Sequence, residues 1–264
     1  MMPMRITISG IPCISGDADV ELKPINVVYG PNQSCKTTLA RYVYAAIKLY
    51  SGHRSAVRIL PKSKATIRIS GSSDAEFTID PDRPVQTRVA GTSGPVSIYL
   101  PSHRVAYISS LRFITSGRSI FESLPGEASS LISSIMDSLQ DMIAGYLRSL
   151  LGVDADFMMR DLAALDIDIN SFAASNDSMT NMEVIFAVLN RAPQGAVVVI
   201  DDVDNYLDDS YADAVSEIAS MAKNRGVVLF ATTRRGDVAS VKVQDAALFK
   251  LEPVDGRWSL HSYS

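Results

Sequence analysis

One stretch near the N-terminus, Gly30-Pro-Asn-Gln-Ser-Cys-Lys-Thr37, has residue types that can hold a polyphosphate. It follows an apolar segment, Ile25–Tyr29, that is typical of a strand, and it precedes apolar residues at helical spacing. A glycine turn that ends in lysine and a hydroxyl residue, between a strand and a helix, is the phosphate-binding P-loop. Its backbone N–H groups and the positive end of the helix dipole attract phosphate oxygens. The stretch therefore predicts a site for ATP.

The residues of this loop can be given individual roles. We expect Lys36 to reach the β- and γ-phosphates and Thr37 to offer its hydroxyl to Mg²⁺. Cys35 departs from the pattern, which has glycine before the lysine; a side chain at this close approach is expected to crowd the nucleotide or tilt the loop, weakening binding. The predicted nucleotide-contacting residues are Gly30, Pro31, Asn32, Gln33, Ser34, Cys35, Lys36, Thr37 and Thr38.

Two acids follow a second apolar segment, residues 196–200, which is typical of a buried parallel strand. A P-loop needs an acid that helps to hold Mg²⁺ and a group that orients the attacking water. We assign the metal to Asp201 together with Thr37, and we assign polarisation of the water to Asp202. The alternative is that the two aspartates only cap the next helix.

Patterns of hydrophobicity predict the elements that must position these residues. Residues 5–9 and 20–23 read as a hairpin that leads into the strand before the P-loop. Residues 51–100 are expected to form an antiparallel β subdomain, and residues 118–176 a helical subdomain, both within a single domain, 1–264. The short alternating runs of the β subdomain are 56–60, 65–69, 76–79, 85–89 and 96–100.

From residue 177 onward, helical and strand patterns alternate. A helix is expected at Asp177–Arg191, strands at 196–200 and 226–231, a helix between them, and a terminal hairpin after residue 246. Together with the P-loop, this predicts an α/β fold with a mostly parallel sheet, covered by helices, whose nucleotide lies at the carboxyl ends of the strands. An apolar stripe over residues 131–151 can either pack on the body of the protein or serve as a dimer-forming stub.

Composition and charge narrow the class further. The net charge is −4, but residues 51–121 carry ten basic and four acidic residues, a net charge of +6, which predicts a DNA-binding face or an ordinary solvated face. No apolar run approaches a membrane span and no signal-peptide core is present, so a cytoplasmic protein is expected. Cys13 and Cys35 are too few for a disulfide framework or a zinc site. A hairpin beside the P-loop strand can bring them close together, and a redox switch is one interpretation.

The whole chain resembles the ABC-type ATPase heads of the SMC, RecF and OLD-like group, in particular compact AAA ATPase proteins without long coiled coils. Four stretches carry this resemblance. They are the P-loop segment 28–39, the turn Tyr99-Leu-Pro-Ser-His-Arg104, the Walker B and D-loop segment 198–207, and the switch strand 229–234. The resemblance implies a P-loop NTPase fold with an antiparallel β subdomain and a helical subdomain.

The resemblance also implies that two heads close on two ATP molecules, as a homodimer or with another ATPase head. A signature serine of one head then caps the γ-phosphate held by the other, about 23 residues before the Walker B aspartate. This places the role on Ser178, with Ser175 as a second candidate. Met179 and Thr180 stand where the family has glycines, and Asp177, an acid, would repel a γ-phosphate.

Two further departures concern hydrolysis. The family has a glutamate at the position of Asp202, and the shorter aspartate should hold the water less well. Arg234 replaces the switch histidine, and its guanidinium can contact a γ-phosphate. No glutamine stands in the Q-loop region, where Ser102 or His103 would have to serve. Slow hydrolysis of Mg-ATP coupled to head dimerisation, with action on DNA, is one expected function; a degenerate, non-catalytic head that binds nucleotide, DNA or a partner is the other.

Overall fold

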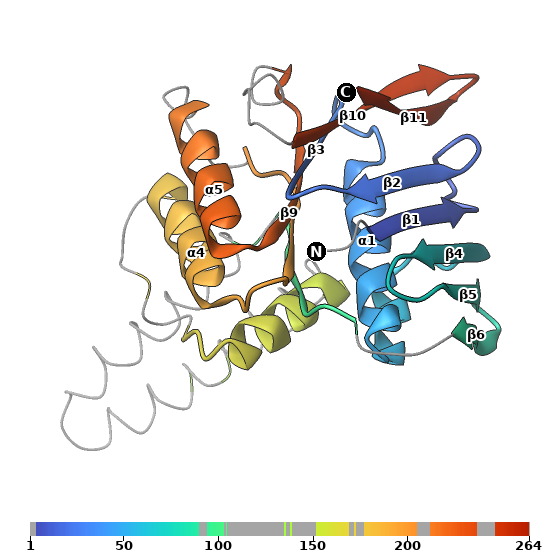
Figure 1. The fold of residues 1–264 in the computed structure, drawn as a ribbon, viewed down its shortest axis with the longest axis horizontal. Coiled ribbons are helices and arrows are strands. Elements are labelled where there is room, and N and C mark those ends of the chain that lie inside the picture. The colour runs from blue at the N-terminus through green and yellow to red at the C-terminus, as the bar shows by residue number, and fades with distance from the viewer. Residues whose placement is uncertain are drawn as a thin grey trace.

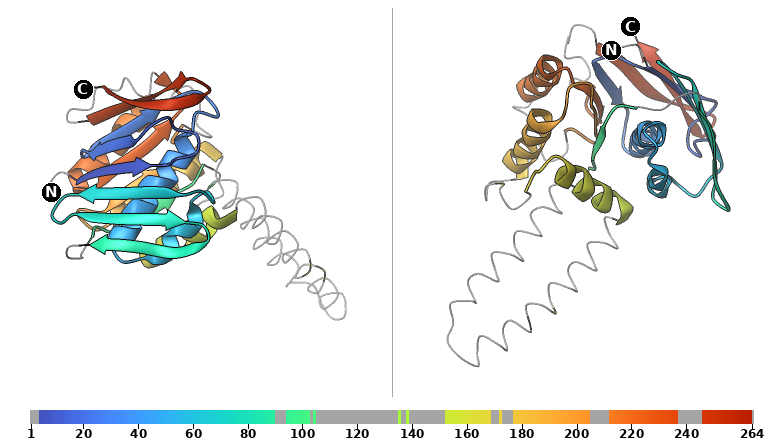
Figure 2. Two further views of the ribbon diagram at one scale, coloured as in Figure 1. Left: turned by 90° about the vertical axis from the view of Figure 1, so that its right-hand side faces the viewer. Right: turned by 60° about the horizontal axis from the view of Figure 1, so that its bottom comes forward.

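Helix α1 (Lys36–Tyr50), which follows the P-loop, lies between two β-sheets, and the other elements form layers around it (Figure 1). The fold is described from a computed structural model. The described residues are 4–89, 94–102, 104, 135, 138, 152–168, 172, 177–204, 212–236 and 246–263. The right-hand view of Figure 2 shows the layers edge-on: helices α4 (Asp177–Arg191) and α5 (Ala212–Arg225), the first sheet, α1, and the second sheet.

The first sheet is mostly parallel, as the sequence predicts. Its strand order is β11-β10-β3-β9-β8-β7, and each neighbouring pair is parallel except β10 with β11. Because the strands run in one direction, the carboxyl ends of β3, β9 and β8 lie at one edge, beside the P-loop. The strands are β3 (Ile25–Tyr29), β7 (Ser97–Leu100), β8 (Val197–Ile200), β9 (Val228–Thr233), β10 (Ala246–Val254) and β11 (Arg257–Tyr263).

The second sheet is antiparallel and has the order β2-β1-β4-β5-β6. Apolar and polar residues alternate in its strands, so one face packs against α1 and the other faces solvent. In β4, for example, Ala65, Ile67 and Ile69 are buried, whereas Arg68 and Ser70 between and after them are exposed. The strands are β1 (Met4–Ser9), β2 (Ala18–Leu22), β4 (Ala65–Ser70), β5 (Ala75–Asp80) and β6 (Arg83–Val89).

Two predicted strands of the β subdomain are wrong in type or place. Residues 56–60 were expected as a strand, but Arg54–Ile59 form a 3₁₀ helix, η1. Its buried residues Ala56 and Ile59 are three apart, which matches the three residues per turn of a 3₁₀ helix. Residues 96–100 were expected in the antiparallel sheet, but β7 is the parallel edge strand beside β8. All four residues of β7 are buried, as they must be when layers cover both faces of a sheet.

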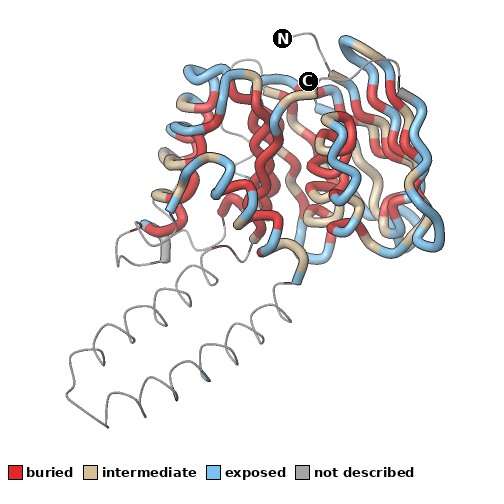
Figure 3. Tube along the Cα trace, turned by 90° about the horizontal axis from the view of Figure 1, so that it is seen from below, coloured by how far each residue is buried: buried red, intermediate tan, exposed pale blue. Residues whose placement is uncertain are grey.

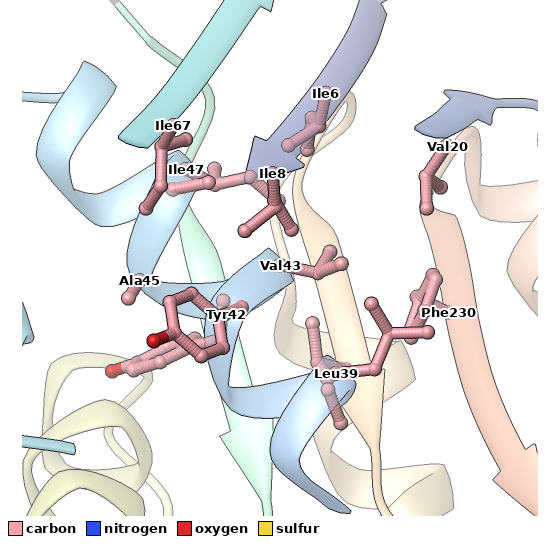
Figure 4. Close-up of a cluster of buried hydrophobic side chains, with 14 of the residues drawn as sticks. Ile6, Ile8, Val20, Leu39, Tyr42, Val43, Ala45, Ile47, Ile67 and Phe230 are labelled. Atoms are coloured by element: carbon pink, nitrogen blue, oxygen red, sulfur yellow. The ribbon is translucent and has the colours of Figure 1, made fainter. Parts of the chain in front are cut away.

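Helix α1 is buried on nearly every side because it has a sheet on each side. The sequence pattern indicated one apolar face, yet Tyr42, Tyr44 and Ala45 are also fully buried. Figure 4 shows Leu39, Val43 and Ile47 of the helix among side chains of both sheets. Burying each such side chain contributes about 1.5–3 kcal/mol, so this packing fixes the helix that follows the P-loop.

The other face of the parallel sheet is covered by α4 and α5. Alternate residues of β8 point to opposite sides: Val197 and Val199 pack in the core around α1, and Val198 and Ile200 pack in the core around α4 and α5. Figure 3 shows the buried residues concentrated in the central strands and on the inner sides of the helices. The unalternating apolar sequence of this strand is therefore explained by its two cores.

Part of the predicted helical subdomain is described. Residues 152–164 are helical, and Asp161 anchors them to α1 and β7. Its carboxylate accepts hydrogen bonds from the Tyr44 hydroxyl (2.9 Å), Lys48 Nζ (2.8 Å) and the Tyr99 backbone N–H (3.0 Å). The stripe predicted over 131–151 lies outside the described residues, apart from Ile135 and Ser138, which are exposed. Among the helices that the structure describes, none has the length and apolar character needed to cross a membrane.

Candidate nucleotide-binding site

The P-loop connects β3 to α1 and has an unusual backbone. Gln33 and Cys35 have φ angles of 65° and 71°, in the left-handed region that glycine adopts most easily. For other residues this conformation costs about 1–2 kcal/mol. The sequence pattern flagged only Cys35, and the conformation of Gln33 was not predicted. The loop therefore keeps a shape that usually needs glycine at both places, at some cost in stability.

Gly30 begins the loop, and its position leaves no room for a side chain. A Cβ atom built there would lie 2.6 Å from the Ser34 hydroxyl oxygen and 3.2 Å from the Leu251 side chain. The Gly30 N–H donates to the Thr233 carbonyl at the end of β9. The close packing of the loop on its neighbouring strands thus explains why glycine stands at this end.

The N-terminus of α1 is open to a ligand. Its N-cap residue is Cys35, whose side chain makes no capping hydrogen bond, and the first turn contains no acidic residue. The first N–H groups of a helix have no preceding turn to bond, and the helix dipole places positive charge there. The loop and helix start can therefore bind phosphate oxygens through backbone N–H groups.

Lys36 is largely buried, and its ammonium group bonds to the loop itself. Nζ donates to the carbonyl oxygens of Gly30 (2.9 Å) and Pro31 (2.7 Å). Burial lowers the pKa of Lys36, against the opposing attraction of the carboxylates of Asp202 and Asp201. A phosphate group would give this cation a stronger, charge-assisted partner than two neutral carbonyls.

A cavity of about 340 Å³ lies over the loop. Its wall combines the P-loop, the start of α1 and Asp202, which comes from the end of β8 more than 160 positions later in the sequence. The structure therefore brings together two predicted parts of the site. The lining residues are Cys13, Asn32, Gln33, Ser34, Cys35, Lys36, Thr37, Thr38 and Asp202.

Asp201 lies at the carboxyl end of β8 and is fully buried. Its Oδ1 accepts a hydrogen bond from the Thr232 hydroxyl (2.7 Å), and that hydroxyl oxygen accepts the Asp202 backbone N–H (2.8 Å). Thr232 on β9 therefore holds both acids in place, a role that the sequence did not indicate. Within the described residues, Asp201 Oδ2 is buried without a hydrogen-bond partner. An unpaired carboxylate oxygen is the feature that a metal ion or its bound water would satisfy.

The donor set fits Mg²⁺ in the manner of P-loop proteins. Mg²⁺ keeps several waters and takes one or two protein ligands plus phosphate oxygens. The described residues contain no cluster of three or more His, Cys, Asp or Glu side chains placed to hold a metal ion. Thr37, which lines the cavity, and Asp201 are the residues here that would hold it.

Replacement of Thr232 by valine tests this arrangement. Valine keeps the shape but leaves a buried oxygen of Asp201 and the Asp202 N–H without their partner, so we expect a loss of about 1–3 kcal/mol in the free energy of unfolding. Urea denaturation measures it. Thr78→Val, at an exposed position of β5, is the matched control and should change stability by less than about 0.5 kcal/mol. Equal stability of Thr232→Val and wild type would contradict this role.

Asp202 is half-buried in a left-handed conformation, with φ of 46°. In the described part of the chain its Oδ1 is a buried atom without a hydrogen-bond partner. Burial raises the pKa of Asp202, and the neighbouring Asp201 raises it further. A carboxylate that is poorly solvated and lines the cavity is suited to accept a proton from water.

Arg234, the predicted γ-phosphate contact, follows β9 and pairs with an acid that the sequence did not single out. Its Nε lies 3.4 Å from Asp204 Oδ2, and its backbone N–H donates to Asp204 Oδ1. The Asp204 side chain is 1% exposed and that of Arg234 is 43% exposed. The buried aspartate thus anchors an arginine whose outer part remains free to meet solvent or a ligand.

Arg104, counted in the basic segment, does not lie on a charged face. It is fully buried, and its Nη1 donates to the carbonyl oxygens of Pro101 and Asp201, at 2.9 Å each. The turn after β7 therefore ends in an arginine that binds the main chain of Asp201. Arg104 therefore does not contribute to the predicted basic surface. Instead it supports the end of β8, where the two acids lie.

The predicted signature position falls at the start of a helix. Ser178 is in the first turn of α4, as expected, while its side chain and Ser175 lie outside the described residues. Met179 is exposed, whereas Thr180 and Asn181 are fully buried. His103, one of the two Q-loop candidates, is also outside the described residues. The structure thus leaves the role of Ser178 as a prediction.

Comparison with known proteins supports the fold. No protein-family model and no curated protein matches the sequence. Three solved SMC head structures match over nearly their whole length. A head bound to the C-winged helix domain of ScpA has 12% identity and a TM-score of 0.56, over 98% of this chain and 97% of that one. A Pyrococcus furiosus head has 12% identity and a TM-score of 0.53, over 100% and 97%, and a Thermotoga maritima head has 10% identity and a TM-score of 0.52, over 100% of both chains. The predicted fold class, a mixed α/β fold of the SMC-head type, is confirmed.

Proposed function

We propose that this chain is an ATP-binding head that holds Mg-ATP and hydrolyses it slowly to ADP and phosphate. The observation that carries the proposal is that Lys36, Thr37 and Asp202 together line one cavity. It lies at the N-terminus of α1 and at the carboxyl ends of the strands, where the fold positions a phosphate-binding loop. The likeness to SMC heads supports this reading at the level of the fold.

The residues divide into binding and chemical roles. The P-loop N–H groups and Lys36 bind the phosphates. Thr37 and Asp201 would hold Mg²⁺, which when bound would supply positive charge beside the phosphate oxygens. Asp202 accepts the proton of the attacking water. Arg234, anchored by Asp204, contacts the γ-phosphate. Non-glycine residues at two left-handed positions and a short aspartate in place of glutamate favour slow turnover.

We include in the proposal a head-to-head dimer, or a pair with another ATPase head, in which Ser178 of one head meets the nucleotide of the other. The whole chain, 1–264, then acts as one ABC-ATPase-like domain. Solved SMC heads with this fold were crystallised with domains of ScpA, so a protein partner is also part of the proposal.

Calorimetry of the reduced protein with ATP and Mg²⁺ tests binding, and phosphate release under the same conditions tests hydrolysis. We expect binding with a Kd in the micromolar range, about −8 kcal/mol, and release slower than about 1 s⁻¹. The competing function is a non-catalytic head. It is favoured by the hydrogen bonds of the Lys36 ammonium group to the loop carbonyls, because that group then has partners without a phosphate. Binding without any phosphate release would support that function, and absence of binding would contradict both forms that use nucleotide.

DNA is proposed as a further partner through the basic segment 51–121. Arg54, Arg58 and Lys62 on and after η1 are exposed, which supports such a contact. By contrast, Arg68 pairs with Glu76 on the antiparallel sheet. Fluorescence anisotropy with duplex DNA should show an association constant that falls steeply with salt, because phosphate contacts release counterions. Binding that is absent at low salt, or unchanged by salt, would contradict the DNA contact.

A further inference from the structure

Two cysteines meet at the wall of the nucleotide cavity. Cys13 and Cys35 are joined by a disulfide, with a Cα–Cα distance of 6.1 Å, inside the range that disulfides require. They are 22 positions apart, and both line the cavity with Lys36 and Thr37. The hairpin predicted from the sequence can bring the two residues close together, and the link joins Cys13 to the loop residue that precedes Lys36.

Cys13 is held at this place by other parts of the chain. It belongs to the turn between β1 and β2, and its carbonyl oxygen accepts a hydrogen bond from the Trp258 N–H (3.0 Å). In the same turn, the Ser15 N–H donates to the Trp258 carbonyl oxygen (2.7 Å). The flanking residues Ile11 and Ile14 are buried. Its side chain is therefore presented from a turn that is fixed to β11.

Cys35 is held equally firmly, at the N-terminus of α1. Its carbonyl oxygen accepts the Leu39 N–H (2.9 Å), the first bond of a buried helix. A thiolate here would lie at the positive end of the helix dipole, beside Lys36, which favours reaction with disulfides. Both cysteines are only partly buried and face a cavity of about 340 Å³, so small thiols can reach them.

We propose that Cys13 and Cys35 form a reversible redox site that weakens nucleotide binding at the P-loop when it is oxidised, because the bond stops the loop from adapting to phosphate. This inference rests on the proposed function, because it concerns binding at the same loop. In the disulfide form, two sulfur atoms occupy the wall of the phosphate cavity and tie the loop to the β1–β2 turn. In the dithiol form, the side chain of Cys35 can rotate away and the loop can adapt to phosphate.

The chemistry balances with a low-molecular-weight disulfide such as oxidised glutathione. One protein thiolate attacks it, forming a mixed disulfide and releasing one glutathione thiolate. The second protein thiolate then attacks the protein-bound sulfur, forming the Cys13–Cys35 bond and releasing the second glutathione. Two electrons pass from the protein thiols to the oxidant, and the two protons end on the released thiols. Excess dithiol reverses both steps.

The experiment compares the affinity for Mg-ATP of the full chain after dithiothreitol and after oxidised glutathione, with the thiol count read by alkylation and mass spectrometry. We expect affinity at least about tenfold weaker in the oxidised form, because the fraction of binding-competent loop falls. Addition of dithiothreitol should restore it. Cys13→Ser, which cannot form the bond and leaves the loop sequence intact, should have one affinity in both conditions.

The outcomes separate this inference from the proposed function. Equal or tighter binding in the oxidised wild type, or two free thiols after treatment with oxidised glutathione, overturns the redox site while ATP binding stands. A redox response that persists in Cys13→Ser also overturns it. Absence of nucleotide binding in the reduced wild type and in reduced Cys13→Ser overturns the proposed function and the redox site together.

Discussion

Replacement of Lys36 by alanine is expected to weaken the binding of Mg-ATP by about 100-fold, or about 2.7 kcal/mol. The ammonium group lies in the wall of the cavity and is already desolvated, so the protein has met the cost of its burial before the ligand arrives. Burial lowers the pKa of Lys36 in the free protein, and a triphosphate would add negative charge that stabilises the ammonium form. The substitution removes that charge from the site.

Calorimetry on reduced protein measures this loss, and Lys62→Ala is the matched control. Lys62 is an exposed lysine after η1, outside the residues that line the cavity, so its removal should leave the affinity within about twofold. A thermal melt of each variant separates lost binding from lost folding, because the alanine also leaves the carbonyl oxygens of Gly30 and Pro31 without their ammonium partner. Equal affinity of Lys36→Ala and wild type would remove the lysine from the site.

The sequence predicted the centre of the fold because strand, turn and helix signals agree there. Ile25–Tyr29, the P-loop and the helix after it are adjacent in sequence, so local patterns suffice to place them. The strand at 196–200 was also predicted correctly, since a short run without polar residues is typical of a strand covered on both faces. Asp202, which follows this strand, lines the same cavity as the P-loop because parallel strands end at one edge of the sheet.

Other features depend on contacts that no local pattern contains. Residues 56–60 alternate like a strand but form part of a 3₁₀ helix, because two apolar residues three apart meet the core. Thr232 bonds to both Asp201 and Asp202, Arg104 bonds to the Asp201 carbonyl oxygen, and Asp204 bonds to Arg234, each across 30 or more positions of sequence. Nothing in their sequence neighbourhoods marks these pairings, so only the folded arrangement of the strand ends identifies them.

The left-handed conformation of Gln33 could not be predicted from the sequence for a different reason. The P-loop pattern accepts any residue at that position, so the motif does not mark Gln33, although its φ of 65° is close to the 71° of Cys35. Both residues carry the steric cost of a Cβ atom, and the packing of α1 below the loop must offset it. The motif marks Cys35 as a departure, whereas the position of its partner Cys13 depends on the contact between the β1–β2 turn and β11.

Replacement of Asp202 by asparagine is expected to abolish hydrolysis while leaving ATP bound, with phosphate release lower by about 10²- to 10⁴-fold, the usual contribution of a general base. An amide keeps the size of the side chain and tolerates its left-handed backbone, but it cannot accept the proton of water. Single-turnover phosphate release measures the effect. Asp255→Asn is the matched control, since Asp255 is an exposed aspartate with φ of 48° in the β10–β11 turn.

The same substitution should stabilise the protein at neutral pH, and this second effect has a defined pH dependence. Burial and Asp201 raise the pKa of Asp202 above its unfolded value, so its contribution to stability is fully present below about pH 4 and is lost as the pH rises through the folded pKa. Asparagine carries no such loss. We therefore expect the variant to gain about 1 kcal/mol, or about 2–4 °C in Tm, at pH 7 and progressively less as the pH falls toward 4.

Both effects must occur together if Asp202 is a base held in a site that disfavours its charge. A carboxylate that only caps the next helix would lose little hydrolysis on replacement, and one that only supports the fold would lose stability at neutral pH. Loss of phosphate release with a higher Tm separates the proposed role from each of these, because catalytic groups are commonly kept in surroundings that cost stability. Unchanged phosphate release in Asp202→Asn, beside an active wild type, would assign the proton transfer to another group.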